Sequence, residues 1–402
     1  MALTAVEDAL AQALADVVPV AVETVPLDRA DGRVLASDLR ALRTQPPFDA
    51  AAMDGWALRS ADAVAPGARL RVVGESAAGH GFAGDVGPGE AIRIFTGAPM
   101  PRGADTVVMQ EATRRDGDVV EIGEVVPAGR HVRAAGIDFH AGDVGLPAGL
   151  RLGYTHVGLI ASMNHAEVPV YRRPRVAFLA TGDELVRPGA PIGPDQIVCS
   201  NGYALAALIA AAGGEAIDLG IAPDDLDATR AAVRAGFATE VDVVVTLGGA
   251  SIGDHDHVHA ALAAEGVDFD FWKIAMRPGK PLMFGRRGAT RVIGLPGNPA
   301  ASLVCAVLFV APLIRALAGQ SEPLPRVHRL PLSRGVPAND LRQDYLRARL
   351  VVGDDGRLLA DPLDSQDSSL LSRFARAEAL IVRPPFAPAA EAGDAVDVVR
   401  LA

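Results

Sequence analysis

Between Val176 and Ala318 the chain alternates apolar runs of strand length with longer segments of helical periodicity. This alternation is typical of a parallel sheet covered by helices on both faces, so we predict a doubly wound α/β domain. Such sheets bind ligands at the carboxyl ends of their strands. The expected strands are Val176–Ala180, Ala216–Ile221, Val241–Leu247 and Arg291–Leu295, and the expected helices are Gly202–Ala212, Asp225–Ala238, His257–Glu265 and Ala300–Ala318.

The segments on either side of this α/β unit have a different texture. A helical pattern ends before Pro19, and from Gln45 to Ala148 short β-like runs are broken by glycine and proline, as in a small barrel or sandwich. The chain after Pro325 ends in short strands. We predict a multidomain α/β plus β protein with these domains: 1–45 plus 140–172, elongated helix and strand; 46–139, inserted and β-rich; 173–324, α/β; 325–402, small and β-barrel-like.

Charge and cysteine content exclude several classes of partner. A net charge of −11 without a basic tail argues against nucleic-acid binding. Only two cysteines, Cys199 and Cys305, are present, which favours a reducing compartment. The longest apolar run, Leu303 to Ile314, contains Pro312 and is too short to span a bilayer, and the N-terminus lacks the basic start of a signal peptide. We expect a cytoplasmic protein that binds neither nucleic acid nor membrane.

Three of the expected strands end in loops rich in glycine and polar residues. These loops are 181–185, 248–256 and 296–299, and the last directly precedes a helix. Glycines let backbone N–H groups approach a ligand, and a helix N-terminus favours an anion, so together the loops predict a site for a phosphate-bearing ligand. The candidate binding residues there are Gly182, Gly248, Gly249, Ser251, Gly253, Pro296, Gly297, Asn298 and Pro299.

The lysines are unusually placed. Of 38 basic residues only Lys273 and Lys280 are lysines, and both lie in one short segment that also contains Arg277. Codon usage alone is one explanation. The other is that this segment requires a compact, strongly hydrated point charge rather than the planar fork of arginine.

Two further motifs in loop 248–256 have alternative interpretations. Gly249 to Gly253 fits the G-x-S-x-G pattern of a hydrolase nucleophile, with Ser251 as nucleophile and His328 as the well-separated histidine. The alternating histidines that start at His255 suggest zinc, but neighbours on a helix face different ways, so a carboxylate such as Asp256 holding magnesium is favoured.

Six motifs in order along the chain give a resemblance to a known family. They are PPFDxxxMDGxA at 46–57, TGAPxPxGADTVVxxE at 96–111, TGDEL at 181–185, GGxSxGxxD at 248–256, KxxxRPGKP at 273–281 and GLPGNP at 294–299. This combination resembles the molybdopterin molybdenumtransferase family, which includes bacterial MoeA proteins and the gephyrin E domain. The match runs from Asp31 to Arg349. The chain departs from the usual pattern at Ala51, Trp56, Arg277 and Asp367.

The resemblance implies a magnesium-dependent enzyme that inserts molybdate into adenylylated molybdopterin and releases AMP. It also implies a homodimer whose cleft lies between the α/β domain of one subunit and the N-terminal domains of the other. Asp54, Glu184 and Asp256 would be the oxygen ligands of the metal, and Arg347 and Ser368 match substrate-binding positions more loosely. The catalytic residues by matching position are Asp54, Thr96, Glu184, Asp224, Asp256, Lys273, Arg277 and Lys280.

Two other functions remain as alternatives to this expectation. The α/β segment alone resembles the single-domain enzymes that adenylylate molybdopterin, and such an adenylyltransferase is also a possible partner. A scaffold that keeps the fold for partner binding is the second alternative. The choice between molybdate and tungstate stays open.

Overall fold

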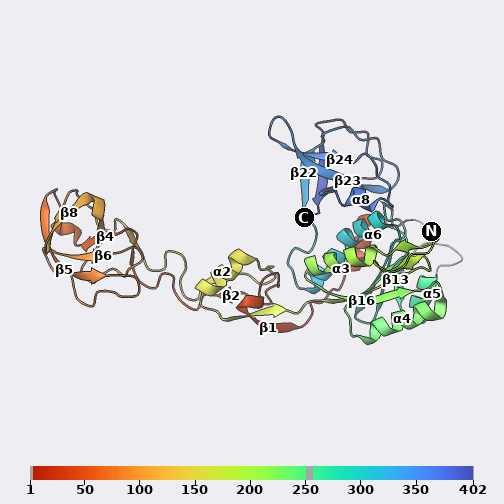
Figure 1. Ribbon diagram of the computed structural model, residues 1–402, viewed down its shortest axis with the longest axis horizontal. Coiled ribbons are helices and arrows are strands. Elements are labelled where there is room, and N and C mark those ends of the chain that lie inside the picture. The colour runs from red at the N-terminus through yellow and green to blue at the C-terminus, as the bar shows by residue number, and fades with distance from the viewer. Residues whose placement is uncertain (1–2, 250–256, 402) are drawn as a thin grey trace.

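A computed structural model describes residues 3–249 and 257–401. The chain forms an elongated molecule with a small β-rich unit at one end and an α/β unit at the other, joined by a narrow middle unit (Figure 1). The C-terminal sheet lies beside the α/β unit. The expected multidomain arrangement of α/β and β-rich units is therefore confirmed.

The α/β unit is built on a six-stranded sheet of order β16-β13-β17-β21-β20-β18. Its four predicted strands lie side by side in parallel. The residues of β13, β17 and β21 are largely buried, as the apolar runs required, whereas in the edge strand β16 only Ala222 is buried. The strands are β13 (Arg175–Thr181), β16 (Glu215–Ala222), β17 (Val243–Leu247), β18 (Asp268–Phe271), β20 (Met283–Arg287) and β21 (Thr290–Leu295).

The sheet is mixed rather than wholly parallel, which corrects our expectation. β20 pairs antiparallel with β21, and β18 pairs antiparallel with β20. The reason is that the connection from β20 to β21 is a tight turn at Gly288, which is too short for a crossover helix. Because β18 is antiparallel to β20 and β20 is antiparallel to β21, β18 runs parallel to β21. The carboxyl end of β18 therefore lies at the same edge of the sheet as those of β13, β17 and β21.

The helices of this unit follow the predicted segments within a few residues. The last of them runs from Pro299 to Leu317 and contains a π-helical stretch, η4 (Ala306–Val310), directly before Pro312. Proline removes a backbone donor, and the π turn absorbs that loss. Of the described helices this one is long and apolar enough to cross a membrane, but 83% of it is buried inside the protein. The helices are α3 (Asn201–Ala211), α4 (Leu226–Ala238), α5 (His257–Ala264), α6 (Pro299–Cys305) and α7 (Ala311–Leu317).

The first helix, α1 (Val6–Leu14), belongs to the packing of the α/β unit. The prediction places residues 1–45, and so this helix, in the N-terminal domain, and those bounds stay a prediction. In the structure Val6, Ala9 and Ala13 are buried in the same hydrophobic cluster as the inner residues of β13, β17 and α7. Apolar spacing predicts which face of a helix is buried, but it does not identify the surface on which that face packs.

The middle unit is a set of short antiparallel pairs with α2 (Tyr154–Ser162) packed against them. β1 (Val22–Pro26) pairs with β12 (Glu167–Tyr171), and β2 (Leu39–Arg40) pairs with β11 (Val144–Leu146). Its small core contains Leu35, Ile160 and Met163.

The distal unit is a six-stranded sheet of order β7-β4-β6-β5-β9-β8. Nearby, β3 (Ala50–Ala51) pairs with β10 (Val132–Arg133). Two hydrophobic clusters cover the sheet, one around Trp56 and the other around Ile92. The strands are β4 (Gly55–Leu58), β5 (Ala68–Ser76), β6 (Glu90–Ile94), β7 (Thr106–Met109), β8 (Thr113–Asp116) and β9 (Val119–Ile122).

The C-terminal unit is a sheet of order β19-β23-β25-β26-β22, with β24 also pairing with β23. Its edge strand β19 (Met276–Arg277) comes from the lysine segment, so the α/β and C-terminal units share a sheet. The exact bounds of the four domains stay predictions. The other strands are β22 (Val327–Pro331), β23 (Gln343–Val352), β24 (Leu358–Pro362), β25 (Ala379–Arg383) and β26 (Ala395–Arg400).

Candidate functional site

A cavity of about 650 Å³ lies at the carboxyl ends of β13, β17 and β21. The three strand-end loops line it together, which explains why each of them is rich in glycine. Ser251, Gly253 and Asp256 lie outside the described residues. The predicted binding residues that line the cavity are Gly182, Gly248, Gly249, Pro296, Gly297, Asn298 and Pro299.

Gly182 is required by the shape of its loop. Its φ of +146° lies in a region that side chains rarely adopt. A Cβ added there would collide with the carboxylate of Glu184, which folds back over the glycine. Any substitution of Gly182 would therefore displace the carboxylate that follows it.

Two helix N-termini point into the same cavity. α3 begins at Asn201 and α6 begins at Pro299, and both residues line the wall. Unpaired N–H groups and the helix dipole make such ends favourable for anions. The cavity is therefore suited to a phosphate-bearing ligand although the net charge of the chain is −11.

Asn201 is a residue of this wall that the sequence did not single out. Its Nδ2 donates a hydrogen bond to the carbonyl oxygen of Gly297, at 2.7 Å. Its Oδ1 is buried and has no hydrogen-bond partner among the described residues. The signal in the sequence was its place directly before the expected helix Gly202–Ala212.

Carboxylates occupy one side of the cavity. Glu184 and Asp224 line it and are exposed, and the backbone N–H of Asp224 donates to the Oδ1 of Asp183, at 3.1 Å. Carboxylate oxygens are the ligands that magnesium prefers. Within residues 3–249 and 257–401, no group of three or more histidine, cysteine or acidic side chains is placed to hold a metal ion.

The lysine segment connects β18 to β20 at this same edge of the sheet. Lys280 is exposed, and the next residue, Pro281, lines the cavity. Lys273 is half-buried. Lys280 is therefore an exposed residue adjacent in sequence to the cavity wall.

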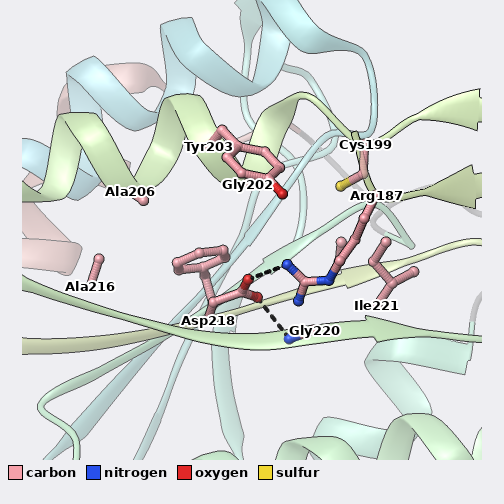
Figure 2. A pocket seen from close by; sticks show the side chains of 11 residues that line it. Arg187, Cys199, Gly202, Tyr203, Ala206, Ala216, Asp218, Gly220 and Ile221 are labelled. Carbon is pink, nitrogen blue, oxygen red and sulfur yellow. Dashed lines mark hydrogen bonds and ion pairs between the residues drawn. The ribbon is translucent and has the colours of Figure 1, made fainter. Parts of the chain in front are cut away.

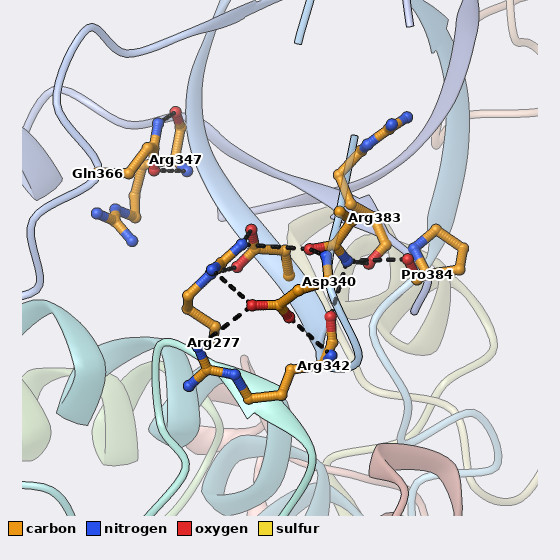
Figure 3. Close-up of polar contacts among 9 residues, drawn as sticks. Arg277, Asp340, Arg342, Arg347, Gln366, Arg383 and Pro384 are labelled. Atoms are coloured by element: carbon orange, nitrogen blue, oxygen red, sulfur yellow. Dashed lines mark hydrogen bonds and ion pairs between the residues drawn. The ribbon is translucent and has the colours of Figure 1, made fainter. Parts of the chain in front are cut away.

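Arg277, between the two lysines, is engaged by carboxylates of the C-terminal unit (Figure 3). Its Nε donates to the Oδ1 of Asp344 at 2.8 Å, and its Nη1 pairs with Asp340 at 3.1 Å. The hydrogen bond and charge of Asp344 raise the pKa of Arg277. The resemblance makes Arg277 a catalytic residue, and in this structure its charge is balanced by two aspartates.

Arg347, on β23, borders a second cavity of about 360 Å³ between the lysine segment and the C-terminal unit. The side chain is almost fully buried and donates to the carbonyl oxygen of Asp367 at 3.3 Å. Burial lowers its pKa. A buried guanidinium with one long hydrogen bond has capacity for a further oxyanion.

Ser368 connects this region to the first cavity. Its hydroxyl accepts a hydrogen bond from the Nδ2 of Asn298 at 3.1 Å, and its carbonyl accepts one from the N–H of Ala300 at 2.9 Å. Asp367, one of the departures from the family pattern, caps the N–H and hydroxyl of Ser369. Ser369 also lines the first cavity, and the sequence analysis missed it.

Asp54 and Thr96 form a separate pair in the distal unit. The Oδ1 of Asp54 accepts hydrogen bonds from the backbone N–H and the hydroxyl of Thr96, both at 2.7 Å. These two bonds hold the pKa of Asp54 below its usual value. The pair is exposed, and Figure 1 shows its unit at the opposite end of the chain from the α/β unit.

A third cavity, of about 200 Å³, lies between α3 and β16 (Figure 2). Ala180 and Cys199 line both this cavity and the 650 Å³ cavity. Its one ion pair joins Arg187 to Asp218 at 2.9 Å, and the rest of the wall is mostly apolar.

The alternative motifs of loop 248–256 find no support among the described residues. His259 is stacked between the rings of Phe269 and Trp272, with centroids 4.4 and 4.0 Å away, and burial lowers its pKa. His328 lies on β22 in the C-terminal sheet. Ser251 and His255 fall outside the described residues.

Three family models match consecutive parts of the chain. They are described as "MoeA N-terminal region (domain I and II)" for residues 4–164, "Probable molybdopterin binding domain" for 177–316 and "MoeA C-terminal region (domain IV)" for 329–401.

Individual proteins show the same similarity. A molybdopterin molybdenumtransferase from Haemophilus influenzae is 34% identical over 94% of both chains. Another from Nostoc is 43% identical over 75% of this chain and 70% of its own. A solved molybdopterin biosynthesis MoeA protein from Pyrococcus horikosii superposes with a TM-score of 0.83 at 32% identity, and covers 99% of both chains.

Proposed function

Because the chain belongs to the molybdopterin molybdenumtransferase family of molybdenum cofactor biosynthesis, we propose that it inserts molybdate into adenylylated molybdopterin and releases AMP in a magnesium-dependent reaction. One observation carries this proposal. A single cavity of about 650 Å³ joins three glycine-rich strand ends, two helix N-termini and two carboxylates. Those groups suit a ligand that carries a phosphoanhydride.

The basic residues divide between two functions. The exposed Lys280, next to the cavity residue Pro281, and the buried Arg347 would bind oxyanions, and Lys273 would support them from the same segment. Arg277 would hold the lysine segment against Asp344 instead of binding substrate. Ser368 would orient Asn298 at the start of α6.

The acidic residues suit a magnesium ion whose remaining ligands are supplied by the substrate. Glu184 and Asp224 supply hard oxygens at one wall of the cavity, and such a pair with substrate phosphates is the usual environment of Mg²⁺. When bound, the ion would neutralise negative charge on the phosphoanhydride. Asp256 would add a third carboxylate, and Asp54 would join from the other subunit.

A homodimer would complete this site. The carboxylate of Asp54 is hydrogen-bonded to Thr96 and interacts with the charge of Arg93, and their unit is remote from the cavity of the same chain. In a two-fold dimer the distal unit of one subunit would cover the cavity of the other. A carboxylate of this shared cleft would then orient the attacking oxygen.

The cellular setting follows from the same chemistry. Both cysteines are free and buried, which supports a reducing compartment, and we place the enzyme in the cytoplasm. Its substrate would come from a molybdopterin adenylyltransferase, which is a candidate partner.

The test is incubation with adenylylated molybdopterin and Mg²⁺, with and without molybdate. We expect AMP release that depends on molybdate and formation of molybdenum-loaded molybdopterin. Glu184→Gln should slow the reaction about 100-fold or more, as expected for loss of a catalytic carboxylate. Absence of molybdate-dependent AMP release from the unmodified protein would contradict the proposal.

A further inference from the structure

The extreme N-terminal segment of the chain lies against the lysine segment. The backbone N–H of Thr4 donates to the carbonyl oxygen of Lys273 at 3.1 Å, and the N–H of Ala275 donates to the carbonyl oxygen of Thr4 at 2.7 Å. The two bonds bracket Ile274 as a parallel bridge. Residues far apart in sequence therefore fix the register of the loop that carries Lys273.

The two lysines are held in different ways. The carbonyl oxygen of Lys280 accepts a hydrogen bond from the N–H of Ile274 at 3.1 Å, which closes the segment on itself. Farther along, Ala275 accepts a bond from the N–H of Gln343 at 2.8 Å. The backbone of Lys273 is instead bonded through its carbonyl to Thr4, so the N-terminal segment is its partner.

The N-terminal segment that contains Thr4 is anchored by the helix that follows it, α1. α1 begins at Val6, and Val6 and Ala9 are buried in the core of the α/β unit. At the other end of α1, Arg291 donates to the carbonyl oxygens of Ala15 and Asp16, at 3.1 and 2.9 Å. α1 therefore packs in the α/β unit, although the chain after it soon leads to the middle unit (Figure 1).

We propose that residues 3–5 are a positioning element that sets the Lys273 ammonium group for oxyanion binding. This inference rests on the proposed function, because the lysine segment is the part of the site assigned to molybdate and phosphate. Thr4 acts through its backbone, and therefore through Lys273, and touches no substrate. Loss of its bonds would free the loop without removing any charge from it.

The chain offers an unusually direct readout, because it contains only two lysines. Lys273 is half-buried and Lys280 is exposed, so the ratio of their acetylation rates reports the order around Lys273 with Lys280 as an internal reference. Thr4→Pro removes the N–H that binds Lys273, whereas Thr4→Ala keeps both backbone bonds and loses only the side chain.

We expect Thr4→Pro to raise the Lys273-to-Lys280 acetylation ratio at least about threefold, as local opening exposes the amine. The KM for molybdate should rise about tenfold with a smaller change in kcat, since ground-state binding is weakened. Thr4→Ala should keep the acetylation ratio of the unmodified protein. A variant lacking residues 2–4 should behave like Thr4→Pro, which keeps the test valid if the proline variant folds poorly.

An unchanged acetylation ratio in both Thr4→Pro and the shortened variant would overturn the inference. A changed ratio with an unchanged KM for molybdate would overturn it too, because the order of the loop would then have no effect on molybdate binding. Failure of the proposed function is separate: it would appear as no molybdate-dependent AMP release from the unmodified protein.

Discussion

At the scale of single residues, the choice between lysine and arginine is informative. The chain uses arginine for almost all of its positive charge. The structure shows Arg277 in a forked pair with Asp344, while Lys280 is exposed next to the cavity residue Pro281. A guanidinium suits a planar carboxylate partner, and an ammonium group suits a compact oxyanion. The two kinds of basic residue in one segment therefore have different neighbours for a physical reason.

Replacement of the lysines tests this interpretation. Lys280→Arg should reduce kcat/KM for molybdate about tenfold or more, the size of one lost charge-assisted hydrogen bond. Lys273→Arg should be measured separately. Steady-state AMP release at varied molybdate is the measurement, and full activity of both variants would mean that the lysines reflect codon usage.

The Asp54–Thr96 pair gives a prediction about pH. Thr96→Val removes the hydroxyl donor and keeps the backbone donor, so the pKa of Asp54 should move up toward its usual value. Below that pKa the carboxylate is protonated and inactive, so the acid limb of the kcat/KM profile should shift to higher pH.

Ser60→Ala is the matched control for this variant. The carboxylate of Asp105 accepts hydrogen bonds from the backbone N–H and the hydroxyl of Ser60, at 2.7 and 2.9 Å. This is the same pair of hydrogen bonds as in Asp54–Thr96, but it lies outside the proposed site. Its pH profile should match that of the unmodified enzyme. An acid limb that stays in place in Thr96→Val would show that Asp54 is not the group that titrates.

At the scale of elements, α4 and α5 are joined by an ion-pair cluster. Glu265 accepts from the Nε of Arg230 and from the guanidinium of Arg234, which lowers its pKa to about 2. A carboxyl whose folded-state pKa lies below its unfolded value of about 4.5 stabilises the fold above that value. This contribution is lost as the pH falls from about 5 toward 2.

We therefore expect Glu265→Gln to lower the melting temperature at pH 7.5. The difference from the unmodified protein should shrink through pH 4 and fall to about a quarter of its full size at pH 2.5, measured by thermal scans across this range. Glu322→Gln is the control, because its pair with Arg326 is exposed on both sides and contributes little. A pH-independent difference between Glu265→Gln and the unmodified protein would contradict the ion-pair explanation.

Elements with strong periodicity were predictable from the sequence, and those defined by partners were not. The buried runs of β13, β17 and β21 and the glycines at their ends identified the sheet and one wall of the cavity. β18 and β20 carry weak alternation, and β19 has two residues, so nothing local marked them.

The same limit applies to the site residues. Motif positions such as Glu184 and Asn298 were found, since turns and anion loops have local signatures. The hydrogen bonds between Arg277 and Asp344 depend on a pairing of strands that are 67 positions apart in the sequence. The hydrogen bond between Thr4 and Lys273 joins residues that are still farther apart. Contacts of that kind follow from tertiary packing alone.

At the scale of the whole molecule, the elongated shape separates the parts of the proposed site. The cavity with Glu184 belongs to the α/β unit and Asp54 to the distal unit. Figure 1 shows these two units at opposite ends of the chain. Two subunits in antiparallel arrangement would bring the two ends together. Each active site would then combine the α/β cavity of one chain with the Asp54–Thr96 pair of another.

Complementation between inactive variants measures this most directly. Asp54→Asn and Glu184→Gln should each be nearly inactive in molybdate-dependent AMP release. After unfolding and refolding together in equal amounts, half of the dimers are mixed, and each mixed dimer has one cleft without a substitution. We predict recovery of about a quarter of the unmodified activity. Activity of the mixture no greater than that of the two variants alone would contradict the shared cleft.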